Sequence, residues 1–128
     1  MNVTINRLAP LVLGAVLLAG CAKPPAEQID AAEKALKDAQ MSGAATYSAQ
    51  EYAKLEASLA AMKKEVADQD GKFALLRDYG KAEQLAASAK ADGERVKADA
   101  VKKKEEAKAG ALQAQQVAQE AVKAAVEL

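Results

Sequence analysis

The chain has 128 residues, enough for one domain at most, and it carries 18 basic and 18 acidic residues, a formal net charge of zero. Hydrophobic residues make up 51% of the sequence, but most are alanine; aromatic residues make up 3%, and tryptophan and histidine are absent. This composition argues against a thick globular core, because burying alanine contributes about 0.8 kcal/mol where leucine or phenylalanine contributes about 1.5–3 kcal/mol. The balanced charge argues against a nucleic-acid partner.

The first twenty residues have the features of a secretory leader. Arg7 supplies a positive charge ahead of an apolar run from Leu8 to Ala19. At about 1.5 Å per residue, this run is too short to span a bilayer core of about 30 Å comfortably. We therefore predict a signal peptide over residues 1–20 rather than a membrane-spanning helix.

The end of this run resembles the bacterial lipobox, in which a peptidase cuts before a cysteine that carries acyl chains such as palmitate. The residues of the motif are Leu18, Ala19, Gly20 and Cys21. The only cysteine of the chain cannot form an internal disulfide, so it is a free thiol, an intermolecular link, a ligand or a modification site. Because the positive residue, the apolar run and the motif follow one another in the expected order, we expect cleavage before Cys21 and lipid on its sulfur. The alternative is an uncleaved anchor with an incidental cysteine.

Residues 21–26 form the predicted tether. Pro24 and Pro25 favour an extended spacer, so the body should begin within about 20 Å of the headgroups, at ~3.1 Å per residue. Ala22 stands where Gram-negative lipoproteins retained at the inner membrane have aspartate. By that resemblance we expect a lipid-anchored protein of the outer membrane that faces the periplasm, provided that the host has two membranes.

The first predicted helix runs from Ala26 to about Met41. Its apolar stripe has the spacing of an amphipathic helix and consists of Ile29, Ala32, Leu36 and Ala39. Two i,i+4 ion pairs are expected on the outer face, Asp30 with Lys34 and Glu33 with Lys37.

A second helix is predicted after a connection at 44–47. Ser42 and Gly43 are typical of a helix end. Ser48 and Glu51 have the spacing of a capping box, in which each side chain bonds the other's backbone N–H. The seam of this helix alternates between steps of three and four residues and consists of Tyr52, Leu55, Leu59, Met62, Val66, Gln69, Phe73 and Leu76.

Two positions compete for the turn that follows. Asp70-Gly71 is the stronger local turn pair, but the seam keeps its phase until about Arg77. We place the turn between Arg77 and Gly80.

The longest pattern runs from Tyr79 to Leu128, with a small or apolar residue at every third or fourth position. Such a heptad seam is typical of a left-handed coiled coil. Lys103 interrupts the seam; it either sets register or oligomeric state, or its stem passes beside a weak contact. Gly93 and Gly110 each cost about 1 kcal/mol relative to alanine in a helix, so we expect the tail to gain from self-association or from a partner.

The predicted fold class is all-α. We expect a small antiparallel helical hairpin or three-helix body over residues 27–90, which runs into an alanine-rich coiled-coil extension over residues 91–128. No residues form a catalytic or metal-binding constellation, since histidine and a second cysteine are absent. We therefore predict no enzyme, no metal and no cofactor apart from the lipid on Cys21.

Residues 26–95 resemble a group of bacterial lipoproteins that carry the uncharacterised "domain of unknown function 4398". The resemblance rests on Ala32 to Ala39, Gly43-Ala44, Tyr47-Ser48, Arg77 to Tyr79, and Ala82, Leu85, Ala86 and Ala89. It implies an envelope location and a helical fold, without an established activity. The seam after residue 86 resembles the alanine-zipper murein lipoprotein, which joins peptidoglycan through a C-terminal lysine; this chain ends in leucine, so covalent wall attachment is not expected.

These patterns predict a structural or scaffolding lipoprotein of the cell envelope. Its expected partners are the membrane, through the lipid, and a second copy, an envelope protein or peptidoglycan, through the long helix. The alternative is a periplasmic client-binding, chaperone-like module.

Overall fold

The computed structural model describes residues 21–128, and Leu18, Ala19, Gly20 and the rest of the predicted leader lie outside the described residues. The elements are α1 (Ala26–Met41), α2 (Ala44–Tyr47), α3 (Ala49–Asp70), the 3-10 turn η1 (Ala74–Leu76) and α4 (Gly80–Val126). Residues 21–128 contain no strand, and the predicted all-α class is confirmed.

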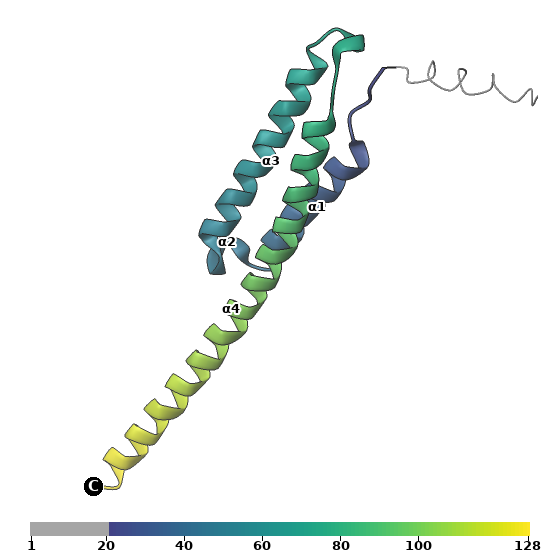
Figure 1. Cartoon of the computed structure of the whole chain (residues 1–128). Coiled ribbons are helices and arrows are strands. Elements are labelled where there is room, and N and C mark those ends of the chain that lie inside the picture. Colours follow the sequence, from purple (N-terminus) through teal and green to yellow (C-terminus); the bar gives the residue numbers. More distant parts are fainter. Residues whose placement is uncertain (1–20) are drawn as a thin grey trace, which may run out of the picture.

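Three helices form the body, with α1 and α4 parallel to each other and α3 antiparallel to both (Figure 1). The starts of α1 and α4 lie together, since the Gln28 amide donates to the Glu83 carboxylate over 3.4 Å. Lys81 near the start of α4 pairs with Glu65 near the end of α3, at 3.1 Å. The predicted three-helix body that runs into one long helix is therefore confirmed.

Helix α1 buries the predicted stripe. Ala32 and Ala39 are fully buried, while Ile29 and Leu36 are partly buried against the core. The two ion pairs predicted along the helix are wrong. The packing of α3 brings Lys63 to 2.8 Å from Glu33, and Lys34 instead pairs with Asp38, at 2.7 Å.

The junction of α1 and α3 is tighter than predicted. Gly43 follows α1 with φ of 88°, a left-handed conformation that favours glycine. Residues 44–47, the predicted connection, form the helical turn α2. Ala44 is fully buried beneath α4, and such a small side chain allows the turn to lie flat on the body.

The connection between α3 and α4 uses both candidate turns. The chain leaves α3 after Asp70 and enters α4 at Gly80, so a single turn between Arg77 and Gly80 is wrong. Gln69 is buried as the seam predicted, but Phe73 and Leu76 are exposed rather than buried. Helix α3, and with it the helical spacing of the seam, ends before Gly71. Phe73 and Leu76 therefore do not lie on the inward face of α3.

The core is thin and consists largely of alanine. Most of the bulky buried residues come from α3, and Tyr79 before α4 adds another; those of α3 are Tyr52, Leu55, Leu59 and Met62. Helix α4 contributes mainly small residues: Ala82, Ala86, Ala89, Gly93, Val96 and Ala100. These positions follow the predicted long seam, which is therefore confirmed as the inward face of α4 up to Ala100.

Beyond the body α4 continues as a single helix (Figure 1). Every residue from Glu105 to Leu128 is exposed. The 47 residues of α4 correspond to about 70 Å at 1.5 Å per residue. The predicted boundary at 90–91 falls within α4, and contact with the body continues to Ala100. We call residues 105–128 the free tail.

Candidate functional site

Cys21, the predicted lipidation site, is exposed at the start of the described residues. Residues 22–25 are not helical, and α1 begins directly after the two prolines. The Pro25 carbonyl accepts the Ile29 N–H at 3.0 Å, a hydrogen bond of the first helical turn. A sulfur in this position is accessible to a modifying enzyme, and only a short, proline-stiffened segment separates it from the body. Lipidation itself remains a prediction.

The segment at 21–25 and the α3–α4 connection lie at the same end of the body, and the free tail leaves at the opposite end (Figure 1). This arrangement follows from the parallel packing of α1 and α4, whose first turns meet at Gln28 and Glu83. We call the end that carries Cys21 and the α3–α4 connection the anchor end.

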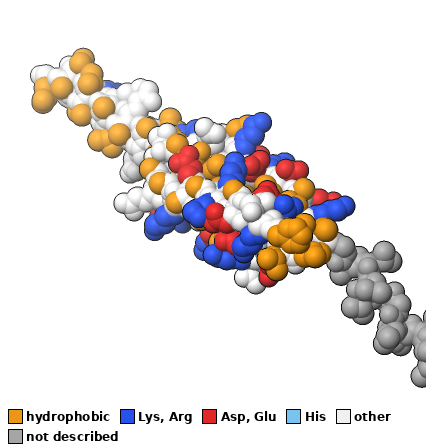
Figure 2. All heavy atoms as spheres, turned by 90° about the horizontal axis from the view of Figure 1, so that it is seen from above, with side chains coloured by type: hydrophobic (Ala, Val, Ile, Leu, Met, Phe, Trp, Pro, Cys, Tyr) orange, Lys and Arg blue, Asp and Glu red, His pale blue; other side chains and the backbone are white. Residues whose placement is uncertain are grey.

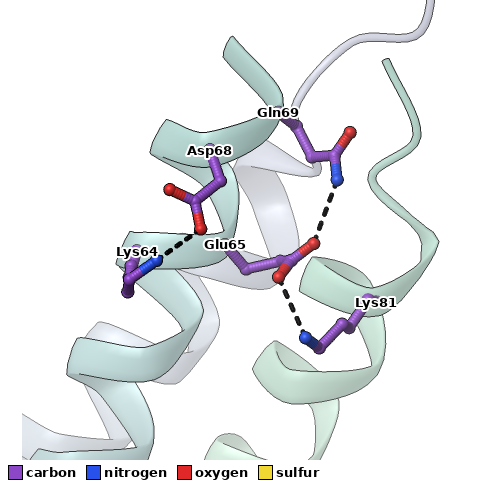
Figure 3. A network of polar contacts seen from close by, with 5 residues as sticks. All are labelled: Lys64, Glu65, Asp68, Gln69 and Lys81. Atoms are coloured by element: carbon purple, nitrogen blue, oxygen red, sulfur yellow. Dashed lines mark hydrogen bonds and ion pairs between the residues drawn. The ribbon is translucent and has the colours of Figure 1, made fainter. Parts of the chain in front are cut away.

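A polar network holds the α3–α4 connection at the anchor end (Figure 3). The buried Gln69 amide donates to one oxygen of Glu65 at 3.0 Å, and its carbonyl accepts the backbone N–H of Asp78 at 3.0 Å. The other Glu65 oxygen pairs with Lys81 of α4 at 3.1 Å. Gln69 therefore joins the last turn of α3 to the residue that precedes α4 by two positions.

Glu65 is the charged member of this network. Hydrogen bonding from Gln69, with the Lys81 ammonium next, lowers the pKa of its carboxyl. The carboxylate is therefore ionised at neutral pH and serves both partners as an acceptor. The sequence pattern found Gln69 only as a seam position. Gln69 is a polar residue in a seam that otherwise consists of apolar residues such as leucine and methionine. That contrast could have indicated that its side chain is buried and forms hydrogen bonds.

Further contacts fix the same connection. The Arg77 guanidinium donates to the backbone carbonyls of Asp70, at 2.9 Å, and Lys72, at 3.0 Å. The buried Tyr79 hydroxyl bonds the Asp70 carboxylate, and this bond raises the pKa of Tyr79. The Asp78 carboxylate accepts the Gly80 N–H at 2.9 Å, at the first residue of α4.

A second polar cluster lies toward the other end of the body. Ser48 is only 2% exposed, and its hydroxyl donates to the Asp99 carboxylate at 2.6 Å. The predicted capping box with Glu51 is therefore wrong, and α3 has no side-chain cap. The hydroxyl instead bonds α4, because packing places a carboxylate directly over the start of α3.

Lys103, the predicted register residue, completes this cluster. Its ammonium lies 2.8 Å from the same oxygen of Asp99, one turn earlier in α4. Hydrogen bonds from Lys103 and then Ser48 lower the pKa of Asp99. Lys103 stands in the last turn of α4 beside the body, with its side chain 43% exposed. A role in register remains a prediction.

Two shallow grooves flank α4 where it contacts α3 and α1. The α3–α4 groove is lined by Glu51, Lys54, Leu55, Asp92, Arg95, Val96, Asp99 and Lys103. Cationic and anionic side chains alternate along the groove. Its electrostatic potential therefore has no uniform sign that would attract a charged ligand.

Among residues 21–128 no group of three or more potential ligands could hold a metal ion. None of the described helices combines the length and apolar character that crossing a bilayer requires. The chain matches no protein-family model, no curated protein and no solved structure. The resemblances to lipoproteins given above remain predictions.

Proposed function

We propose that this chain is a lipid-anchored structural protein of the cell envelope, held to a membrane through Cys21 and extending the free tail toward a partner. The observation that carries the proposal is that the exposed cysteine and the free tail leave the body at opposite ends (Figure 1). One end is then available for attachment while the other reaches away from it. The proposed location is the periplasmic side of the outer membrane in a two-membrane host.

The lipobox-like motif before Cys21 supports the attachment step. Two or three acyl chains on one residue bind a bilayer durably, since each buried CH₂ contributes about 0.8 kcal/mol and a single myristoyl chain binds only marginally. Such an anchor leaves the body free of any need for a membrane-spanning segment of its own. The helices of the body are accordingly polar on their outer faces.

The free tail supports the interaction step. It exposes Leu112, Val117, Val122 and Val126 to solvent. Most helical stability in proteins comes from packing of an apolar face, and the free tail packs against nothing in the described chain. A second helix, from another copy or from an envelope protein, would supply that packing. We assign no catalytic activity to the chain.

Mass spectrometry of the protein purified from membranes tests the anchor. The expected species begins at Cys21 and carries acyl chains, while a Cys21→Ala variant lacks them. An intact leader with an unmodified thiol would overturn the proposal.

Crosslinking in intact cells tests the tail. Reactive residues placed at Val117 should give adducts with a second copy or an envelope component, whereas residues placed at Lys54 on the body serve as the control. An exclusively monomeric protein without adducts would count against scaffolding. Suppression of the aggregation of a model client by the purified protein would favour the client-binding alternative.

A further inference from the structure

The α3–α4 connection exposes three large apolar side chains next to one another. Phe73 is 71% exposed, Leu75 is 77% and Leu76 is 70%. Figure 2, which views the molecule from above, shows hydrophobic side chains gathered in a patch at this end. The other exposed large apolar side chains among residues 21–128 are Met41, Val101 and those of the free tail. A contiguous apolar patch on a small protein is typical of an interaction surface. We call residues 72–77 the apolar tip.

The apolar tip is held in place by its backbone. The Leu76 N–H bonds the Phe73 carbonyl at 2.8 Å, which closes the turn η1. Arg77 binds the carbonyls on the other side of the turn, and Gln69 holds the chain where it returns to α4. These bonds fix the backbone of the segment that carries the three exposed side chains. Their exposure is therefore a property of the folded chain.

The charges of the apolar tip are positive. Lys72 and Arg77 flank the apolar residues, and the segment between them contains no acidic residue. In the described part of the chain, neither cation forms an ion pair with a carboxylate. The neighbouring Asp70 and Asp78 are engaged by Tyr79 and by the start of α4. Apolar side chains between cations suit an interface of acyl chains and anionic headgroups.

The position of the apolar tip identifies the surface that it meets. It lies at the anchor end, where the segment that begins at Cys21 leaves the body (Figure 1). From the start of α1, the residues back to Cys21 span at most about 17 Å, at roughly 3.3 Å per residue. A lipid-modified Cys21 would hold this end of the body close to the headgroups, within reach of the apolar tip.

We propose that the apolar tip inserts into the lipid interface beside the Cys21 anchor, as a second membrane contact that sets the orientation of the body. This inference rests on the proposed function, since the lipid on Cys21 brings the apolar tip to the membrane. A tether alone lets the body swivel about one point. Two contacts at one end direct α4 and its free tail away from the bilayer.

A single tryptophan reports on this contact, because the chain has none of its own. The protein is expressed with its leader, purified from membranes and reconstituted into vesicles of phosphatidylethanolamine and phosphatidylglycerol. Phe73→Trp places the reporter in the apolar tip, and Leu112→Trp places it on the free tail, at a position that is also exposed (61%). Circular dichroism establishes that both variants keep the helical fold. Emission is recorded with and without lipids brominated on their acyl chains, and vesicle flotation reports anchoring.

We expect both variants to float with the vesicles. Phe73→Trp should show blue-shifted emission that brominated lipid quenches, while Leu112→Trp should emit as in water without quenching. If the protein floats and neither reporter is quenched, the proposed insertion of the apolar tip is contradicted, while the proposed lipid anchor still stands. Quenching of both would also overturn the proposal for the apolar tip, since the whole molecule would then lie on the surface. Unacylated protein that does not float would overturn the proposed function together with this inference.

Discussion

Gly93 of α4 lies directly against Ala35 of α1. A Cβ atom on this glycine would lie 2.7 Å from the Cβ of Ala35, and 3.1 Å and 3.2 Å from its carbonyl carbon and oxygen. Two of these neighbours are backbone atoms, so no side-chain rotation relieves the overlap. The two parallel helices therefore approach as closely as their backbones allow, and this depends on the absence of a side chain at residue 93.

Gly93→Ala is expected to destabilise the protein, although alanine favours helix. Alanine gains about 1 kcal/mol in helix propensity. Overpacking costs roughly 1–3 kcal/mol of folding stability, and we expect this cost to outweigh the gain. Gly110→Ala is the matched control, because nothing lies within 4 Å of the added atom in α4. It should stabilise the helix or leave it unchanged. Thermal unfolding followed by circular dichroism compares the two; a stabilised Gly93→Ala would show that α1 and α4 are not in this contact.

Ser48→Ala should lower the free energy of unfolding by ~1 kcal/mol, because it removes a hydrogen bond to a partly exposed carboxylate. A double-mutant cycle identifies the partner. Ser48→Ala combined with Asp99→Ala should show a coupling energy of about 0.5 kcal/mol or more, whereas the cycle with Glu51→Ala should show none. Coupling of Ser48 to Glu51 instead would indicate that the two residues form the predicted capping box, and it would contradict the hydrogen bond from Ser48 to Asp99.

The Glu65 network should make stability depend on acidity. The pKa of Glu65 is lowered in the folded chain, so its contribution is complete above its unfolded pKa of about 4.3 and is lost as pH falls through the lower folded value. Urea unfolding between about pH 6 and about pH 3 measures this loss. The loss of stability should be smaller in Glu65→Gln than in Glu120→Gln. Glu120→Gln is the control, because it also removes one carboxylate but does so in the free tail, away from the network. Equal losses in the two variants would contradict the network.

Removal of residues 107–128 should leave the body intact. These residues are exposed, so the free energy of unfolding is expected to change by less than about 0.5 kcal/mol, while the helical circular dichroism signal decreases. In the whole protein, hydrogen exchange should be fast at the tail amides and slow in the buried part of α4. Loss of the body on truncation would reveal a contact of the tail with the body or with a second copy.

Helix content, the inward face of each helix and the long seam could be predicted from the sequence. They depend on local propensity and on the period of small and apolar residues, which α1 displays throughout and α4 displays with one interruption, at Lys103. The register of Ala82, Ala86 and Ala89 needed no knowledge of the neighbouring helices.

The partners of individual polar side chains could not be predicted in this way. Glu33 pairs with Lys63, and Ser48 bonds Asp99, across distances of 30 and 51 residues in the sequence. Local rules assigned both residues to neighbours along their own helix. The close approach at Gly93 was likewise hidden, since a propensity scale counts glycine only as a cost. The exposure of Phe73 escaped prediction because the helix, and with it the period, ended three residues earlier.

The parallel course of α1 and α4 also decides how the body would respond to mechanical load. Tension between Cys21 and the C-terminus pulls α1 and α4 in opposite directions along their shared axis. The interface then slides in shear, so the contacts along its whole length resist together instead of opening one turn at a time. Because force-driven rupture follows the unfolding rate, a thin, alanine-lined interface in this geometry withstands pulling better than the same contacts would if the two helices were peeled apart.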